Sequence, residues 1–106
     1  MQFLGIDLGT SGIKVILLDD NDVLIAQATS ALEVSRPAPL WAEQEPSVWW
    51  QATNLAISDL QKSHSQALAS VQSIGLSGQM HGAALLDQHD QVIRPAILWN
   101  DGRSET

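Results

Sequence analysis

Two runs of apolar residues separated by a short polar turn constrain this chain more than any other feature. The first run leads up to Asp7, and the second follows the segment Gly9-Thr10-Ser11-Gly12. Glycine accepts the backbone angles that a tight turn requires, so residues 2–8 and 13–19 are predicted to be the two antiparallel strands of a hairpin.

The turn at residues 9–12 has the chemistry of an anion site. Its N–H groups and the hydroxyls of Thr10 and Ser11 suit a phosphate, and glycine lets a ligand approach the main chain. Asp7 is placed to hold a hydrated Mg²⁺ facing that phosphate, because Mg²⁺ keeps several waters and uses few carboxylates. A polar hairpin turn without a ligand is the alternative interpretation. Neither G-x-x-x-x-G-K-[ST] nor G-x-G-x-x-G occurs in the chain.

The composition limits the class of protein. A chain of 106 residues fits one domain, and a hydrophobic content of 44% is enough for a folded core. Five Lys and Arg against 12 Asp and Glu give a net charge of −7, which argues against a nucleic-acid partner. The absence of Cys excludes disulfides and thiolate metal sites, and it fits a cytoplasmic location. No secretory signal and no apolar run of ~20 residues is visible, so no membrane partner is expected.

The pattern after the hairpin predicts an α/β fold. Residues 23–32 are expected to form a third strand, and prolines mark residues 33–45 as irregular. A helix is predicted to begin at Pro46 and to end near residues 62–65. The residues at helical spacing on its apolar face are Val48, Trp49, Ala52, Leu55, Ala56 and Leu60.

Residues 71–77 are predicted to form a fourth strand. It follows a helix, so a crossover should place it parallel to the first strand. Ligands of open α/β sheets gather where the strands reach their carboxyl ends. The turn at residues 9–12 and the loop at residues 78–82 are therefore expected to open on the same rim, with Asp7 and His81 projecting toward a shared cleft.

The remaining residues complete a predicted five-stranded mixed sheet with the order third, second, first, fourth, fifth. Residues 83–86 are the fifth strand, residues 91–93 return from a turn, and residues 96–98 are a further apolar run. Asp101 is placed to cap a helix that would begin near Arg103.

A second group of polar side chains lies between Gly78 and Gly82. Flanking glycines let a loop present Gln79, Met80 and His81 close to a ligand. An amide and an imidazole bond the hydroxyls of a polyol, and Met packs on its carbon face. A structural histidine without a ligand is the alternative interpretation.

Four motifs, in order, resemble those of the FGGY carbohydrate kinases, which belong to the actin-like ATPase superfamily. The match covers essentially the whole chain. The motifs are Gly5 to Lys14 (the first phosphate motif), Trp41-Ala42-Glu43-Gln44-Glu45-Pro46 (W-x-E-Q-[DE]-P), Gln79-Met80-His81-Gly82, and Trp99-Asn100-Asp101-Gly102-Arg103 (W-N-D-x-R). The third is similar to the sugar-binding segment of the xylulose kinase branch, whereas glycerol-type relatives carry charged residues there.

The resemblance implies a ribonuclease-H-like domain and the ATP-dependent phosphorylation of D-xylulose to D-xylulose 5-phosphate. It implies that Asp7 assists Mg²⁺ and the transferring phosphoryl group. The implied phosphate contacts are Gly9, Thr10 and Ser11.

The candidate substrate-binding residues are Gln79, Met80, His81 and Asp101. For Asp101 and Arg103, a structural ion pair is at least an equal alternative. The implied partners are therefore a small sugar and ATP with Mg²⁺, and a homodimer is left open.

The chain departs from that family in length. Family members run to several hundred residues, and their general base, an Asp, has no counterpart here. Phosphoryl transfer depends on positioning and charge stabilisation, which half of a cleft does not supply. Residues 1–106 are thus expected to be the N-terminal segment of the family's N-terminal domain, with the remainder of that domain and the C-terminal domain absent, and to be inactive alone.

Three other interpretations stay open. One is a different FGGY ketopentose or polyol kinase. Another is a ribonuclease-H-like metal-dependent nuclease, in which Asp7 would be a metal ligand and Asp87 the only nearby second carboxylate. The third is a subdomain without activity that self-associates through exposed apolar surface.

Overall fold

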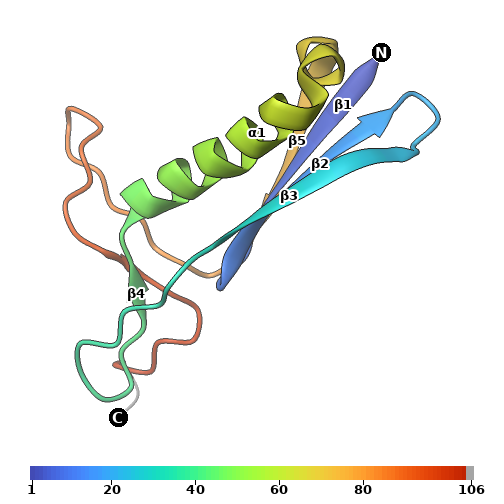
Figure 1. Cartoon of the computed structure of the whole chain (residues 1–106). Coiled ribbons are helices and arrows are strands. Elements are labelled where there is room, and N and C mark those ends of the chain that lie inside the picture. Colours follow the sequence, from blue (N-terminus) through green and yellow to red (C-terminus); the bar gives the residue numbers. More distant parts are fainter. Residues whose placement is uncertain (105–106) are drawn as a thin grey trace.

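The computed structural model describes residues 1–104, and its centre is a four-stranded sheet with one long helix on one face (Figure 1). The elements in chain order are β1 (Gln2–Leu8), β2 (Gly12–Asp19), β3 (Leu24–Ala31), β4 (Glu43–Gln44), α1 (Pro46–Ala69), β5 (Val71–Gly78) and β6 (Ala96–Ile97). The main sheet has the order β3-β2-β1-β5, with β1 antiparallel to β2 and parallel to β5. The predicted hairpin, third strand and parallel crossover are confirmed.

The core lies between α1 and one face of the sheet. Ile13, Val15 and Leu17 alternate along β2 and are almost completely buried. They pack with the buried helix residues Ala52, Ala56 and Leu60. Successive side chains of a strand point to opposite faces, so Asp7 lies on the face of β1 opposite the core residue Leu4.

The helix leaves β5 uncovered. It packs mainly over β2 and β3, and it meets β1 less. As a result Ile74 and Leu76, two apolar residues of β5, are 58% and 78% exposed.

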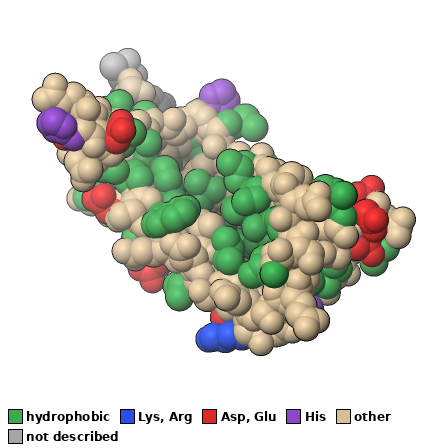
Figure 2. All heavy atoms as spheres, turned by 90° about the horizontal axis from the view of Figure 1, so that it is seen from above, with side chains coloured by type: hydrophobic (Ala, Val, Ile, Leu, Met, Phe, Trp, Pro, Cys, Tyr) green, Lys and Arg blue, Asp and Glu red, His purple; other side chains and the backbone are tan. Residues whose placement is uncertain are grey.

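Figure 2 shows hydrophobic side chains in the middle of the molecule seen from above, with acidic side chains toward its ends. Within residues 1–104, no helix is both long and apolar enough to cross a bilayer.

The helix extends further than the sequence predicted. It ends at Ala69, but His64 has non-helical backbone angles (φ −138°, ψ 44°), so a kink lies where the end was expected. The prediction of its end was wrong because Ala67 and Leu68 pack against the core beyond the kink. The Ser70 N–H then bonds the Ala67 carbonyl at 3.1 Å and closes the last turn.

The fifth strand of the main sheet was predicted wrongly. In the described part of the chain the sheet ends at β5, and residues 83–86 make only isolated bridges, Ala83 with Ile97 and Leu86 with Val92. The Ala83 N–H bonds the Ile97 carbonyl at 3.0 Å, which draws this segment toward β6 and away from the edge of β5.

The chain forms a second, two-stranded sheet in place of the predicted fifth strand. Its strand β6 pairs antiparallel with β4, which lies in the stretch predicted to be irregular. The buried side chains of Ala42, Ala96 and Leu98 make this pairing favourable. No helix begins at Arg103 within the described residues. Residues 105–106, into which the predicted helix would continue, lie outside the described part of the chain.

Candidate functional site

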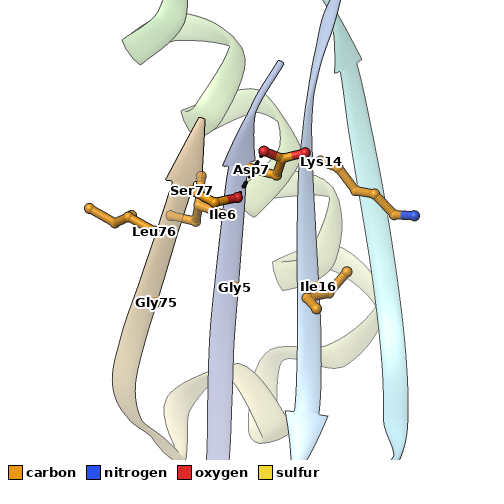
Figure 3. Close-up of a pocket in the computed structure, with 8 residues that line it drawn as sticks. All are labelled: Gly5, Ile6, Asp7, Lys14, Ile16, Gly75, Leu76 and Ser77. Carbon is orange, nitrogen blue, oxygen red and sulfur yellow. Dashed lines mark hydrogen bonds between the residues drawn. The ribbon is translucent and has the colours of Figure 1, made fainter. Parts of the chain in front are cut away.

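Asp7 lies near the carboxyl end of β1, on the open face of the sheet. Its neighbours in register are Lys14 of β2 and Ser77 of β5. The Ser77 hydroxyl donates a hydrogen bond to Asp7 Oδ1 at 2.9 Å, while the Lys14 side chain extends away from the carboxylate (Figure 3). The exposed carboxylate has no ion-pair partner among residues 1–104.

A hollow of about 400 Å³ surrounds this carboxylate. Gly5 and Gly75 are partners in the parallel pair of β1 and β5, and neither brings a side chain to the open face. A Cβ on Gly5 would lie 2.9 Å from the Ile16 side chain, so this position needs glycine. The full lining is Gly5, Ile6, Asp7, Lys14, Ile16, Gly75, Leu76 and Ser77 (Figure 3).

The turn between β1 and β2 is held closed by main-chain hydrogen bonds. The Gly9 N–H donates to the Gly12 carbonyl at 2.9 Å, and the Leu32 N–H donates to the Ser11 carbonyl at 2.9 Å. The Thr10 hydroxyl is engaged inside the protein, as described below. Ser11 is exposed and is the hydroxyl of this turn that solvent reaches most easily.

The segment after β5 begins where the parallel ladder ends. The Gln79 N–H donates to the Leu8 carbonyl at 2.8 Å, which extends the pairing of β5 with β1. His81 follows with φ 61°, a left-handed conformation that side chains rarely adopt and that is often found at functional sites. Met80 is 69% exposed.

The predicted placement of Asp7 and His81 on one rim is confirmed by the topology. Asp7 lies near the carboxyl end of β1, and His81 follows the carboxyl end of the adjacent parallel strand β5. They line different hollows, because His81 lies in a smaller one of about 190 Å³ that also includes Trp49 at the start of α1. A cleft shared by both side chains therefore stays a prediction.

A ring of hydrogen bonds joins the turn and this segment, and the sequence did not reveal it. The Thr10 hydroxyl donates to Gln79 Oε1 at 3.1 Å, and Gln79 Nε2 donates to Gln44 Oε1 at 3.3 Å. Gln44 Nε2 closes the ring by donating to the Thr10 carbonyl at 2.7 Å. The W-x-E-Q motif was the signal that Gln44 matters, but only the fold brings it beside Thr10.

Asp101 and Arg103 form the ion pair that the sequence left as an alternative. Asp101 accepts from Arg103 Nε and Nη2 at 2.9 and 2.7 Å and from the Ala42 N–H at 2.6 Å. The hydrogen bonds from the Arg103 guanidinium hold the pKa of Asp101 well below its usual range, although partial desolvation opposes this shift. The Asp101 side chain is only 1% exposed, which favours the structural role; a sugar contact by Asp101 stays a prediction.

Glu43 extends this pair into a cluster. Its carboxylate accepts from both Arg94 and Arg103, and its side chain is 8% exposed. The Arg103 guanidinium carbon also lies 3.8 Å from the ring centroid of Trp41. The W-x-E-Q and W-N-D-x-R motifs are therefore parts of one structural cluster beside the small sheet.

The chain is similar to carbohydrate kinases along its whole length. The xylulose kinase of Escherichia coli K12 is 57% identical over 102 residues, which cover 96% of this chain and 21% of that protein. The xylulose kinase of Bacillus subtilis is 41% identical over 101 residues, covering 95% and 20%. The chain thus spans about a fifth of the length of these relatives.

Solved structures agree with the sequence comparison. A crystal structure of a xylulose kinase from Brucella ovis superposes with a TM-score of 0.97 at 50% identity, covering 98% of this chain and 22% of that one. The xylulose kinase from Rhodospirillum rubrum gives 0.93 at 30% identity, covering 99% and 22%. These are kinases of the actin-like ATPase fold, as the sequence predicted. Residues 2–106 match the N-terminal domain of the FGGY family of carbohydrate kinases, and the chain belongs to that family.

Proposed function

We propose that this chain is the N-terminal part of an ATP-dependent kinase that converts D-xylulose to D-xylulose 5-phosphate. The observation that carries the proposal is the parallel pairing of β1 with β5, which brings Asp7 and the His81 segment to one rim of the sheet. The names of the relatives support the substrate. Its proposed partners are a sugar and ATP. Its expected location is the cytoplasm, where both are present.

Asp7 is suited to hold a hydrated Mg²⁺. It is an exposed carboxylate oriented by Ser77, and residues 1–104 contain no group of three His, Cys, Asp or Glu side chains that could enclose a metal. A single carboxylate fits Mg²⁺, which keeps several waters and is held largely by substrate phosphates. When bound with ATP, the ion neutralises charge on the phosphate oxygens.

Ser11 would contact the phosphates through its exposed hydroxyl, and Thr10 through its N–H group, because the Thr10 hydroxyl is engaged with Gln79. The Gly9 N–H bonds the Gly12 carbonyl, so Gly9 would contribute by letting the phosphates approach the main chain.

The sugar would contact Met80 and His81. An imidazole bonds sugar hydroxyls, and the exposed Met80 side chain offers an apolar surface for the carbon face. Gln79 has one amide hydrogen beyond its bond to Gln44, and its sugar contact is also part of this proposal. The left-handed backbone at His81 fixes the direction of the loop.

The segment alone is proposed to be inactive. A general base must accept the proton of the attacking sugar hydroxyl. His64 lies in the kink of α1 and His89 in the turn after residues 83–86, and neither lines the hollow of Asp7 or that of His81. The base and the second wall of the cleft would come from outside this segment.

No observation favours the nuclease. Asp87, its second carboxylate, accepts hydrogen bonds from the His89 and Gln91 N–H groups at 2.7 and 3.0 Å and so stabilises its own turn. The net charge of −7 also disfavours binding to a nucleic-acid backbone.

The test is a phosphorylation assay on the full-length enzyme that carries this segment. ADP release is measured with D-xylulose, D-ribulose, gluconate and glycerol, and the product is identified by NMR. The highest kcat/KM is expected for D-xylulose, with phosphate on O5. A higher value for another sugar would revise the substrate, and no sugar-dependent ADP release at all would remove the kinase assignment.

A further inference from the structure

We infer that Gln44 is a positioning residue that holds the Thr10 turn and the Gln79 loop in one fixed arrangement. The inference rests on the proposed function, since it assigns the turn to ATP and the loop to the sugar. Nothing about Gln44 requires contact with either substrate. Its role would be to set the distance between the two halves of the site.

The Gln44 amide uses its full hydrogen-bonding capacity. Its Nε2 donates to the carbonyls of Thr10 at 2.7 Å and Glu33 at 3.3 Å. Its Oε1 accepts from Trp49 Nε1 at 2.9 Å and from Gln79 Nε2 at 3.3 Å. Two donor hydrogens and two acceptor lone pairs are all that a primary amide has, so no capacity is left over.

The surroundings make this amide rigid. Gln44 is 2% exposed, and its backbone pairs with Ala96 in the small sheet. Buried hydrogen bonds are strong when satisfied and costly when one partner is lost. Trp49 Nε1 adds the start of α1 to the same group. Contacts with both the helix and the small sheet therefore fix the Gln44 side chain, and the fixed side chain restrains the other members of the ring.

The ring that Gln44 closes joins loops, not core elements. Thr10 belongs to the turn beside Asp7, and Gln79 belongs to the loop that carries His81. The Thr10 hydroxyl also accepts from Trp99 Nε1 at 2.9 Å, so the W-N-D-x-R segment adds a third support. A displacement of about 1 Å between reacting groups costs up to ~10²-fold in rate, so a link of this kind has a direct effect on transfer.

The test uses two variants of the full-length enzyme that open the ring at different points. Gln44→Met keeps the approximate shape and removes all four hydrogen bonds. Gln79→Met removes the link from the loop side and leaves the buried small sheet intact. The KM for ATP, the KM for D-xylulose and kcat are measured separately, together with the melting temperature of each variant.

Two controls separate positioning from simple loss of stability. Gln51→Met makes the same chemical change at an exposed amide of α1. Leu60→Ala lowers stability from the core, where Leu60 is 2% exposed, without touching the ring. Both are compared well below their melting temperatures, so that the folded fraction is the same.

Gln44→Met is expected to lower kcat/KM for both substrates by about tenfold to a hundredfold. Gln79→Met is expected to raise the KM for ATP as well as that for the sugar, which a sugar contact alone would not do. The double variant should lose little more than the worse single variant, because either change opens the same ring. Both controls should stay within about twofold of the parent enzyme.

The inference is overturned if the folded Gln44→Met enzyme matches Leu60→Ala in kcat/KM. Should Gln44→Met fail to fold, an unchanged KM for ATP in Gln79→Met overturns it equally. If the parent enzyme phosphorylates no sugar, both the proposed function and the inference that rests on it are rejected. Activity in the parent enzyme with no effect of either ring variant removes the inference alone.

Discussion

The Ser77 hydroxyl donates a hydrogen bond to Asp7 Oδ1 at 2.9 Å, across the parallel pair of β1 and β5. The two residues are 70 positions apart in the sequence, and the crossover helix brings them into register. The bond limits the rotation of a carboxylate that is otherwise exposed. It also ties the acid of the first strand to the strand that leads to His81.

The carboxylate of Asp7 is expected to matter for turnover more than for sugar binding. In the full-length enzyme, Asp7→Asn should lower kcat by at least ~10²-fold, because the amide no longer holds a hydrated Mg²⁺ opposite the phosphate. The dissociation constant of D-xylulose, measured by calorimetry without ATP, should change less than about threefold. Equal losses in both quantities would contradict this role.

Ser77→Ala is a milder version of the same test. It frees the carboxylate without removing it, so a loss of about 1 kcal/mol in transition-state stabilisation, or roughly fivefold in kcat, is expected. Ser73→Ala, on an exposed residue of the same strand, is the matched control. The two variants are compared by kcat at saturating substrate, and identical values would remove the proposed link.

His81 combines a proposed sugar contact with a left-handed backbone, and two variants separate these features. His81→Ala should weaken sugar use by about 1–3 kcal/mol if it leaves a buried hydroxyl without a partner. His81→Gly loses the same imidazole, but glycine accepts φ 61° at no cost, so this variant should melt at a higher temperature than His81→Ala. The KM for D-xylulose should rise in both. Normal KM values in both variants would exclude the contact.

The ion pair of Asp101 and Arg103 predicts a definite pH dependence. The hydrogen bonds from Arg103 lower the folded-state pKa of Asp101, so its stabilisation is fully present above the ordinary Asp pKa of about 3.9 and is lost as the pH falls below it. Asp101→Asn should therefore lower the melting temperature at pH 7, and the difference from the parent should shrink below pH 4. A constant difference from pH 7 to pH 3 would contradict the shift.

Exposed apolar residues predict self-association of residues 1–106 when they are produced alone. Ile74 and Leu76 on β5 are 58% and 78% exposed, and Leu86 and Ile93 beyond it are 52% and 62% exposed. Light scattering should give a mass above that of a monomer of 11.5 kDa. The double change Leu76→Ser and Ile93→Ser should shift the mass toward the monomer. A monomeric parent segment at high concentration would be the contrary result.

The sequence by itself determined the local structure and the chemistry of the loops. Apolar runs in residues 2–8 and 13–19, with glycines between them, predicted a hairpin, and the crossover rule then oriented β5. Asp7 and His81 could be assigned to one rim because strand direction alone decides which ends meet.

Only the tertiary structure decided the pairings that depend on competition between distant segments. Residues 83–86 have the pattern of a strand, but a pattern does not say which edge a strand joins, and the bridge between Ala83 and Ile97 turns them toward β6. The helix extends beyond its predicted end because Ala67 and Leu68 pack against the core. Gln44 and Gln51 have the same side chain, so the sequence alone does not distinguish their roles. The fold buries the Gln44 amide and brings three segments into contact with it, whereas Gln51 is exposed.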